Sequence, residues 1–295
     1  MDTYKTIKVQ IINAFVDNGE GGNPAGIVLD ADMLSAKDKL EISKKVGLSE
    51  TAFVSESKKA DFKLDFFTPT RQIAHCGHAT IATFSYLKQI GTLKTDNTSK
   101  ETIEGNRKIK IIEDLAFMEQ LAPSYVDVTH KEGIILNSLG LKKTDLIPET
   151  PIRLVNTGNS FIIVPVASAA ILKNIVPDFE LIETISEEFE LIGFYIFTTD
   201  TESTERDATS RMFAPRYGIL EEAATGMAAG PLACYLYDVF GSTKTQFAIQ
   251  QGKFMAKPSP SLIQVDLKIE DGKIAGVMAG GKGILKSEME IKIKV

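Results

Sequence analysis

Short apolar runs interrupted by turn residues dominate the first third of the chain. They are rich in β-branched and aromatic residues, which is typical of β-strands. The predicted strands are IKVQIINAF (7–15), GIVL (26–29), TAFVSES (51–57) and FKLDFFTP (62–69). Between the second and third, SAKDKLEISKKVG (35–47) has helical spacing, with Leu34 and Ser35 at its start and Gly47 at its end.

Two longer apolar segments predict buried helices, because their large side chains recur at helical spacing. They are HATIATFSYLKQIG (78–91) and TGMAAGPLACYLYDVFG (225–241). KEGIILNSLG (131–140) predicts a further short helix, and the tail after residue 246 predicts a β-meander with turns at its Asp-Gly and Gly-Gly pairs. Further strands are expected at 107–113, 115–121, 189–199 and 208–215, and a strand-turn-strand unit is expected at 152–166. Many strands with two central helices indicate an α+β fold rather than a doubly wound sheet.

The two buried helices belong to an internal repeat. CGHATIATFSYL (76–87) aligns with TGMAAGPLACYL (225–236) at an offset of 149 positions. Upstream, in the same order, FTP (67–69) matches FAP (213–215) and GNPAGIVL (22–29) resembles GNSFIIV (158–164). A duplicated domain has this signature. The sequence therefore predicts two similar lobes, residues 1–122 and 123–295, with a possible return of the last strand to the first lobe.

Composition narrows the function classes. The 295 residues have a net charge of -6 and no basic run, which argues against nucleic acid as a partner. No apolar stretch approaches the roughly 18 residues that span a bilayer, and the first residues lack a signal-peptide core. Two cysteines and three histidines without metal-binding spacing argue against a disulfide scaffold and a zinc site. We expect a cytoplasmic protein without metal or cofactor.

The repeated helix starts suggest chemistry. Gly77 and Gly226 each open a helix, and a helix N-terminus has free N–H groups and a partial positive charge. Glycine there lets a carboxylate or phosphate approach the backbone, although it also permits tight helix packing. His78 follows the first glycine, where the helix dipole favours a neutral imidazole. Glu50, Glu221 and Glu222 are candidate acids or bases, or ordinary surface and helix-start carboxylates.

Four motifs together resemble the PhzF-like phenazine biosynthesis isomerase family. They are GNPAGIVL, LSETAF, FFTPTRQIAHCGHATIAT and GILEEAATGMAAGPLA, from about residue 8 to beyond residue 235. The resemblance implies the diaminopimelate epimerase-like fold, with two lobes that each curl a β-sheet or barrel around a central helix. It also implies a homodimer and a cofactor-independent isomerase, which shifts a proton on a small anionic carboxylate metabolite held in the cleft between the lobes.

The resemblance also implies roles for individual residues. Glu50 matches the family's glutamate acid/base, and His78 matches its histidine. Glu222 replaces the family's aspartate, so its carboxylate is one methylene further from the backbone. Met227 replaces the family's serine and removes a hydroxyl donor. The remaining predicted substrate-binding residues are Asn23, Cys76, Gly77, Thr225 and Gly226.

Two other functions remain open from the sequence. A cysteine-type amino-acid epimerase or racemase of the same fold needs one thiol in each half. Cys76 has the required place in the first half, but Thr225 occupies the equivalent position of the second. A non-catalytic small-anion-binding protein is the other alternative, favoured by Met227 and opposed by the Glu50–His78 pair.

Overall fold

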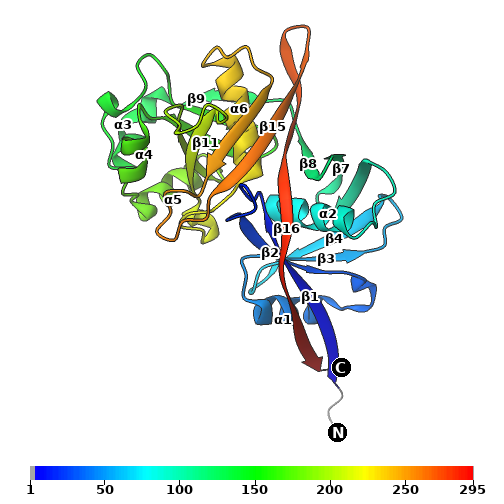
Figure 1. Ribbon diagram of the computed structural model, residues 1–295. Helices are drawn as coiled ribbons and strands as arrows, with labels where there is room; N and C mark the ends of the chain where they lie inside the picture. Colours follow the sequence, from blue (N-terminus) through cyan, green and yellow to red (C-terminus); the bar gives the residue numbers. More distant parts are fainter. Residues whose placement is uncertain (1–3, 295) are drawn as a thin grey trace. The chain divides into compact units, whose positions relative to one another are not determined.

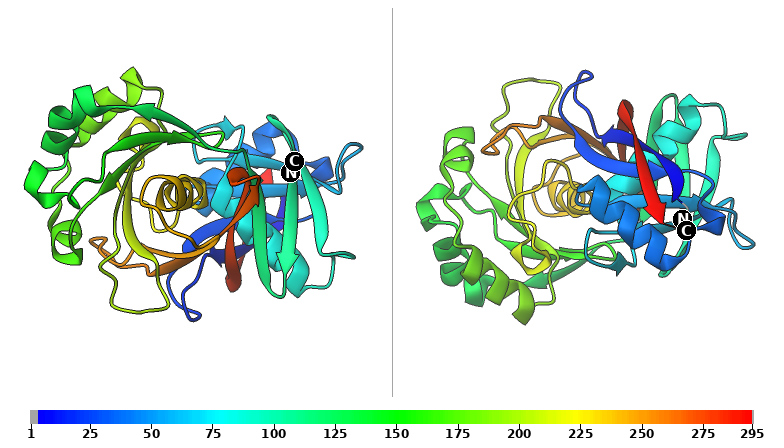
Figure 2. Two further views of the ribbon diagram at one scale, coloured as in Figure 1. Left: turned by 90° about the horizontal axis from the view of Figure 1, so that it is seen from above. Right: turned by 90° about the horizontal axis from the view of Figure 1, so that it is seen from below.

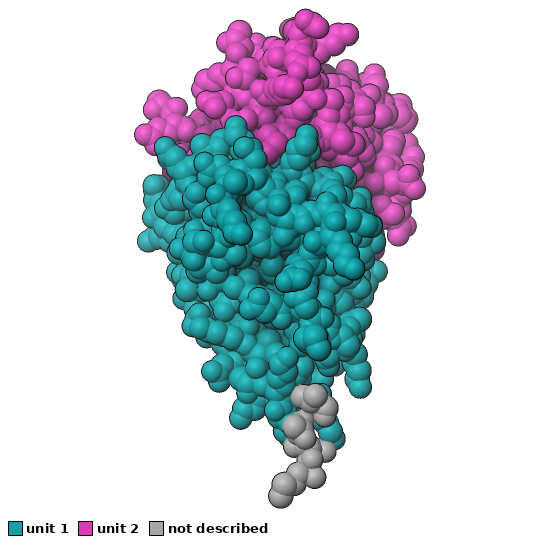
Figure 3. Space-filling model, turned by 90° about the vertical axis from the view of Figure 1, so that its right-hand side faces the viewer, with its two compact units in different colours: residues 1–119, 280–295 teal, residues 120–279 magenta. Residues whose placement is uncertain are grey.

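The computed structural model describes residues 4–294. The chain forms two compact units, unit 1 with residues 1–119 and 280–295 and unit 2 with residues 120–279, coloured separately in Figure 3. The sequence had placed a single division after residue 122, with the return of the last strand left open. Among the described residues no helix is long and apolar enough to cross a membrane.

Unit 1 is a curled sheet that closes on itself around a helix. Its strand order is β1-β2-β3-β4-β6-β7-β8-β16, and β16 also pairs with β1. The strands other than β16 are β1 (Tyr4–Ala14), β2 (Asn23–Val28), β3 (Thr51–Ser55), β4 (Phe62–Phe67), β5 (Gln72–Ile73, paired with β4), β6 (Asn97–Thr102), β7 (Gly105–Ile112) and β8 (Leu115–Gln120). The enclosed helix is α2 (Gly77–Gln89), buried from Gly77 through Leu87.

Helix α1 (Ala36–Val46) packs outside this sheet. Ser35 caps it, since its hydroxyl accepts from the Asp38 N–H while the Asp38 carboxylate accepts from the Ser35 N–H. Gly47 ends the helix in the left-handed conformation at φ 72°, as the sequence predicted. Ile42 and Phe53 belong to the apolar cluster under this helix. A short 3₁₀ helix, η1 (Ala31–Met33), precedes it.

Unit 2 repeats the arrangement around α6 (Gly226–Asp238), which Figure 2 shows end-on in gold with strands curled about it. Its strand order is β16-β15-β14-β13-β12-β11-β10-β9. The strands are β9 (Ser124–Asp127), β10 (Arg153–Asn156), β11 (Ser160–Pro165), β12 (Gly193–Thr198), β13 (Ala208–Phe213), β14 (Gln246–Gln251) and β15 (Ser261–Glu270). The outer helices are α3 (Glu132–Ser138), α4 (Ala169–Asn174) and α5 (Phe179–Glu188), with 3₁₀ turns η2 (Thr129–Lys131), η3 (Lys143–Asp145) and η4 (Pro215–Tyr217).

The strand directions match between the units. In unit 1, β2–β3 and β4–β6 are parallel, whereas β1–β2, β3–β4 and β6–β7 are antiparallel. In unit 2, β11–β12 and β13–β14 are parallel, whereas β10–β11, β12–β13 and β14–β15 are antiparallel. The central helix follows the fourth strand of this series in each case. This shared topology confirms the duplication read from the sequence.

Strand β16 (Lys273–Lys294) belongs to both units, with residues up to 279 in unit 2 and the remainder in unit 1 (Figure 1, red). The predicted Gly-Gly turn at Gly280 is wrong, because the strand runs straight through it. A Cβ on Gly280 would lie 2.2 Å from the Ala116 carbonyl oxygen and 2.6 Å from the Phe117 ring. The glycine therefore allows close packing against β8 rather than a turn.

We predict that Gly280→Ala destabilises the protein by about 1–3 kcal/mol, because backbone and an aromatic ring must move to make room. Urea unfolding followed by circular dichroism measures this change. Gly276→Ala on the same strand is the control, because its Cβ would meet only the Lys268 Cβ at 3.9 Å. Equal stability of the two variants would contradict the packing role of Gly280.

Candidate active site

The start of helix α2 in unit 1 gathers the titratable residues that the sequence singled out. Cys76 is the N-cap, with extended backbone at φ -147°, and Gly77 and His78 form the first turn. The first N–H groups of a helix have no acceptor within it and lie at its positive end. Since α2 is buried on all sides, this helix start is held in place by packing.

Glu50 reaches the same place from the edge of β3. The Gly26 N–H donates to the Glu50 carbonyl oxygen at 3.1 Å, and Gly26 pairs with Thr51 where β2 and β3 run parallel. This ladder fixes the backbone just before β3. The Glu50 side chain is consequently buried, with 7% of the residue exposed.

Glu50, His78 and Cys76 form one buried cluster. The distance between Glu50 Oε2 and His78 Nε2 is 3.3 Å, and that between Cys76 Sγ and His78 Nδ1 is 3.6 Å. The imidazole therefore lies between a carboxylate and a thiol. Oε2 of Glu50 accepts no hydrogen bond from the described residues.

The protonation of the cluster follows from burial. Burial raises the pKa of the Cys76 thiol. The neighbouring Glu50 also raises this pKa, whereas His78 lowers it. The Cys76 thiol contacts Nδ1 of His78, and Nε2 of the same ring faces the Glu50 carboxylate.

The three side chains also place ligand-type atoms within 4.8 Å of one another. Zinc binds such a set only when the cysteine is a thiolate, whereas burial keeps this thiol protonated. A metal ion would therefore have to displace that proton. Asn23, the other predicted unit 1 residue, is buried at the start of β2 opposite Ala14 of β1.

The predicted unit 2 residues surround the start of α6. Thr225 is the N-cap of this helix, and its hydroxyl donates to Glu222 Oε2 at 2.6 Å. Met227 lies in the first turn, where its sulfur accepts from the Asn159 side-chain amide at 3.4 Å. The Gly226 carbonyl oxygen accepts from the Gln120 amide at 2.8 Å.

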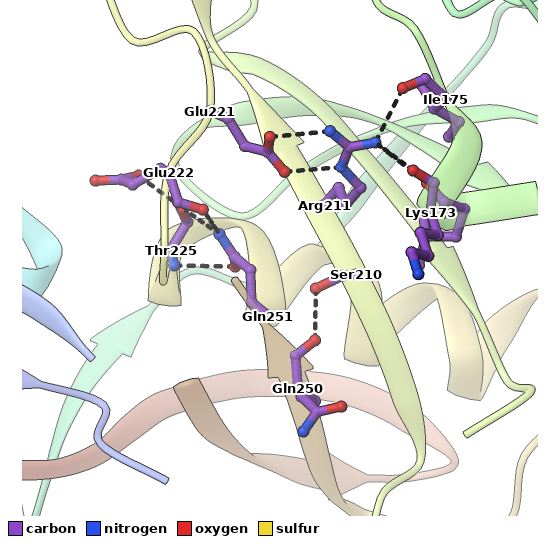
Figure 4. Close-up of polar contacts among 10 residues, drawn as sticks. Lys173, Ile175, Ser210, Arg211, Glu221, Glu222, Thr225, Gln250 and Gln251 are labelled. Carbon is purple, nitrogen blue, oxygen red and sulfur yellow. Dashed lines mark hydrogen bonds and ion pairs between the residues drawn. The ribbon is translucent and has the colours of Figure 1, made fainter. Parts of the chain in front are cut away.

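Gln251 connects this segment to the sheet (Figure 4). Its amide nitrogen donates to the Glu222 carbonyl oxygen at 2.7 Å and to the Thr225 hydroxyl at 3.2 Å. Its amide oxygen accepts from the Thr225 N–H at 3.1 Å and from the Tyr195 hydroxyl at 2.9 Å. One fully buried glutamine thereby fixes the backbone on both sides of the helix start.

Arg211 holds Glu221, so this carboxylate has a structural role. The guanidinium binds Glu221 through two hydrogen bonds of 2.7 and 2.9 Å. Its remaining amino group donates to the carbonyl oxygens of Leu172, Lys173 and Ile175 at the end of α4 (Figure 4). The neighbouring Glu222 instead binds the Thr225 hydroxyl at the start of α6.

The second cysteine does not lie at a helix start. Cys234 is fully buried within α6, about two turns after Gly226, and burial raises the pKa of its thiol. It therefore packs in the core of unit 2, as the sequence indicated.

Sequence reasoning missed Arg211, Gln251 and Lys100. Lys100 is fully buried in β6, a segment to which the sequence reading assigned no strand. Thr98, Lys100 and Thr102 recur at every second position, as expected for one face of a strand, and they are the buried positions of β6.

The fold and the residues at the helix starts together are those of an isomerase or epimerase. The chain belongs to the PhzC-PhzF family, described as phenazine biosynthesis-like protein, whose sequence profile matches residues 12–288. An uncharacterized isomerase of Clostridium acetobutylicum is 30% identical, over 95% of this chain and 96% of the relative. The trans-2,3-dihydro-3-hydroxyanthranilate isomerase of Pseudomonas chlororaphis is 29% identical, over 93% and 95%.

Solved structures agree with this assignment. A PhzF-family protein of Bacillus anthracis matches with a TM-score of 0.87 and 29% identity, over 97% of this chain and 99% of that one. A hydroxyproline epimerase of Agrobacterium vitis shares the fold at a TM-score of 0.60 and 11% identity, over 100% and 95%. The predicted diaminopimelate epimerase-like α+β fold is confirmed.

We predict that Arg211→Met destabilises the protein by about 3–5 kcal/mol, because it leaves the Glu221 carboxylate unpaired and half-buried. Arg153→Met is the matched control, since its 3.0 Å ion pair with exposed Asp127 contributes at most about 1 kcal/mol. Chemical unfolding of both variants measures the difference. A small loss in Arg211→Met would show that the pair does not hold the segment.

Proposed function

We propose that this protein is a cofactor-independent isomerase that shifts a proton between carbon atoms of a small carboxylate metabolite. Glu50 is the acid/base in this proposal, and the start of α2 binds the negative charge of the substrate. His78 and Cys76 hold Glu50 in its reactive arrangement, and Glu222 assists in positioning the substrate.

The observation that carries the proposal is the free acceptor on Glu50. Buried polar atoms are nearly always hydrogen-bonded, so an exception calls for a functional explanation. Glu50 Oε2 is buried and accepts no hydrogen bond from the described residues, while His78 lies 3.3 Å away. A carboxylate with an unused lone pair at a helix start is suited to take a proton from carbon.

The proposed reaction balances with one proton. The Glu50 carboxylate removes a proton from one carbon of the substrate, and the electron pair of that bond spreads through the adjacent unsaturated system. The positive end of α2 stabilises the resulting charge. The protonated Glu50 then returns the proton to another carbon, and the double bonds shift without net change in composition.

The substrate class rests on the relatives and on the helix start. A relative with 29% identity is named for an isomerase of a dihydro-hydroxyanthranilate, which is a cyclic carboxylate. The helix start binds carboxylates without a charged side chain at the contact. Met227 in place of a hydroxyl residue favours a less polar surface on the substrate at that position.

A cysteine-based epimerase is the second candidate, because the Cys76 thiol lies 3.6 Å from His78. Two observations count against it. Burial keeps Cys76 protonated, and the other cysteine, Cys234, lies inside α6 rather than at its start. A pair of thiols at the two helix starts is therefore not available.

We predict that Glu50→Gln lowers the exchange of substrate carbon-bound protons with deuterated solvent by about 10²–10⁴-fold, the usual contribution of a general base. Trans-2,3-dihydro-3-hydroxyanthranilate is the first probe, followed by proline and diaminopimelate, and nuclear magnetic resonance measures the exchange. Glutamine keeps the shape and the buried environment of the side chain.

Cys76→Ala is the comparison that separates the two chemistries. Loss of exchange in Glu50→Gln with retention in Cys76→Ala supports the proposal, whereas the reverse pattern assigns the chemistry to the thiol. Calorimetric binding of the probes without any exchange in the wild-type protein would identify a non-catalytic binding protein.

Met227→Ser is expected to change the melting temperature little, since a partly exposed side chain with one weak sulfur contact contributes under about 1 kcal/mol. It should shift the preference among the probes toward the more hydroxylated one, because a donor is gained. Thermal melts and competition assays measure both effects. A large loss of stability would show that Met227 serves the core.

A further inference from the structure

Lys100 is a buried cation next to the α2 helix start. It lies in the middle of β6 with 0% of its surface exposed. Its ammonium donates to the Thr80 hydroxyl at 2.5 Å and to His75 Nδ1 at 3.2 Å, and lies 5.0 Å from the centre of the Phe66 ring. In the described part of the chain it forms no ion pair with a carboxylate. Burying an ammonium without a counter-ion is costly.

Unit 2 shows that this place does not need a lysine for packing. Strand β14 is the counterpart of β6, because each follows its central helix and lies between a parallel and an antiparallel neighbour. The two strands have the same alternation of buried positions, and the 149-residue offset of the helices carries Lys100 onto Ile249. Ile249 is also fully buried. An apolar side chain thus fills the corresponding position at no electrostatic cost.

A short chain of hydrogen bonds joins Lys100 to the helix start. The ammonium donates to the Thr80 hydroxyl, and this hydroxyl donates to the Cys76 carbonyl oxygen at 2.6 Å. The same carbonyl accepts the Thr80 N–H at 3.3 Å. Cys76 C=O and Gly77 N–H belong to one conjugated peptide group, so donors on the oxygen draw electrons from the nitrogen. Such chains strengthen the terminal donor cooperatively.

Several charged groups set the state of Lys100. Burial lowers the pKa of Lys100 to about 7. Arg107 on β7 also lowers this pKa, whereas Glu104 in the turn after β6, and Cys76 in its ionised form, raise it. Burial also lowers the pKa of His75 well below its usual value, with Lys100 and Arg107 acting in the same direction. His75 is therefore neutral, and its Nδ1 accepts from Lys100 while its proton is on Nε2.

We propose that Lys100 is a positioning residue that acts through Thr80 on the Cys76–Gly77 peptide. It strengthens the Gly77 N–H as a donor and places a positive charge behind the α2 helix start, which favours binding of a carboxylate there. The inference rests on the proposed function in taking this helix start as the element that binds the substrate anion.

The first test reads the peptide directly and needs no ligand. Lys100→Met and Thr80→Val each break the chain of hydrogen bonds between Lys100 and Cys76, whereas Thr80→Ser keeps it. We expect the Gly77 amide proton to move upfield in the first two variants and to keep its wild-type position in Thr80→Ser, as recorded by nitrogen-15 nuclear magnetic resonance at pH 6. Lys39→Met, which removes a buried lysine paired with Asp65, and Lys88→Met, on the exposed end of α2, are the controls.

The second test measures anion binding with anthranilate as the probe. Lys100→Met should bind it about tenfold more weakly than the wild type at pH 6, because the variant lacks the positive charge behind the helix start. The wild-type affinity should fall as the pH rises through the range in which Lys100 loses its proton. In Lys100→Met this pH dependence should be absent, and in Lys88→Met it should remain.

The outcomes separate this inference from the proposed function. An unchanged Gly77 resonance in folded Lys100→Met and Thr80→Val overturns the relay, and an unchanged affinity in Lys100→Met overturns its role in binding. If Lys100→Met does not fold, the Gly77 resonance is compared between Thr80→Val and Thr80→Ser. Equal positions in these two variants overturn the relay. If anthranilate binds to no protein, the choice of ligand class under the proposed function fails, whereas the Gly77 resonance still tests the relay.

Discussion

Both units depend on enclosing a helix that is buried on nearly every side. Helix α2 is buried from its first residue through Leu87, and α6 is buried over nearly all of its length. A helix of this kind must be surrounded by apolar surface, and a sheet curled around it supplies that surface. In unit 1 the pairing of β1 with β16 closes the ring. Enclosure leaves only the helix ends for polar chemistry, and packing fixes where those ends lie.

The two units use this common frame differently. At the start of α2 the chain places a thiol, an imidazole and a carboxylate within contact of one another, with a buried ammonium behind them. At the start of α6 the equivalent positions hold a hydroxyl and a thioether, and the supporting position behind the helix is an isoleucine. Duplication conserved the scaffold, whereas the groups capable of proton transfer are concentrated in unit 1.

The two units also differ in how completely the buried polar groups near their central helices are hydrogen-bonded. Around α6, both ends of the Gln251 amide are hydrogen-bonded, and Arg211 binds Glu221 and the carbonyl oxygens at the end of α4. Satisfied networks of this kind rigidify a segment. Around α2, Glu50 retains an oxygen without a hydrogen bond. An unsatisfied acceptor raises the energy of the resting protein and leaves a reactive lone pair.

Local patterns in the sequence were sufficient for some elements and not for others. The cap of α1 by Ser35 and its end at Gly47 depend on neighbouring residues only, so they were predicted correctly. Helices α4 and α5 and strand β6 were not assigned, although Asp178 caps α5 through its carboxylate. The Gly-Gly pair at Gly280 was misread as a turn, because the contact with Ala116 that requires a glycine comes from a distant strand.

By itself, the sequence determined the duplicated α+β architecture, the two glycine-led helix starts and the choice of Glu50 and His78 as candidates. The architecture and the helix starts rest on periodicity and repetition. The choice of Glu50 and His78 rests on the resemblance of their motifs to the PhzF-like family. Only the tertiary structure decided that Glu50, His78 and Cys76 touch, that Glu221 is committed to Arg211, and that Lys100 lies behind the first helix start. Glu50 and Lys100 reach the start of α2 because strands from separate parts of the chain pair, and strand register is set by the packing of the whole unit.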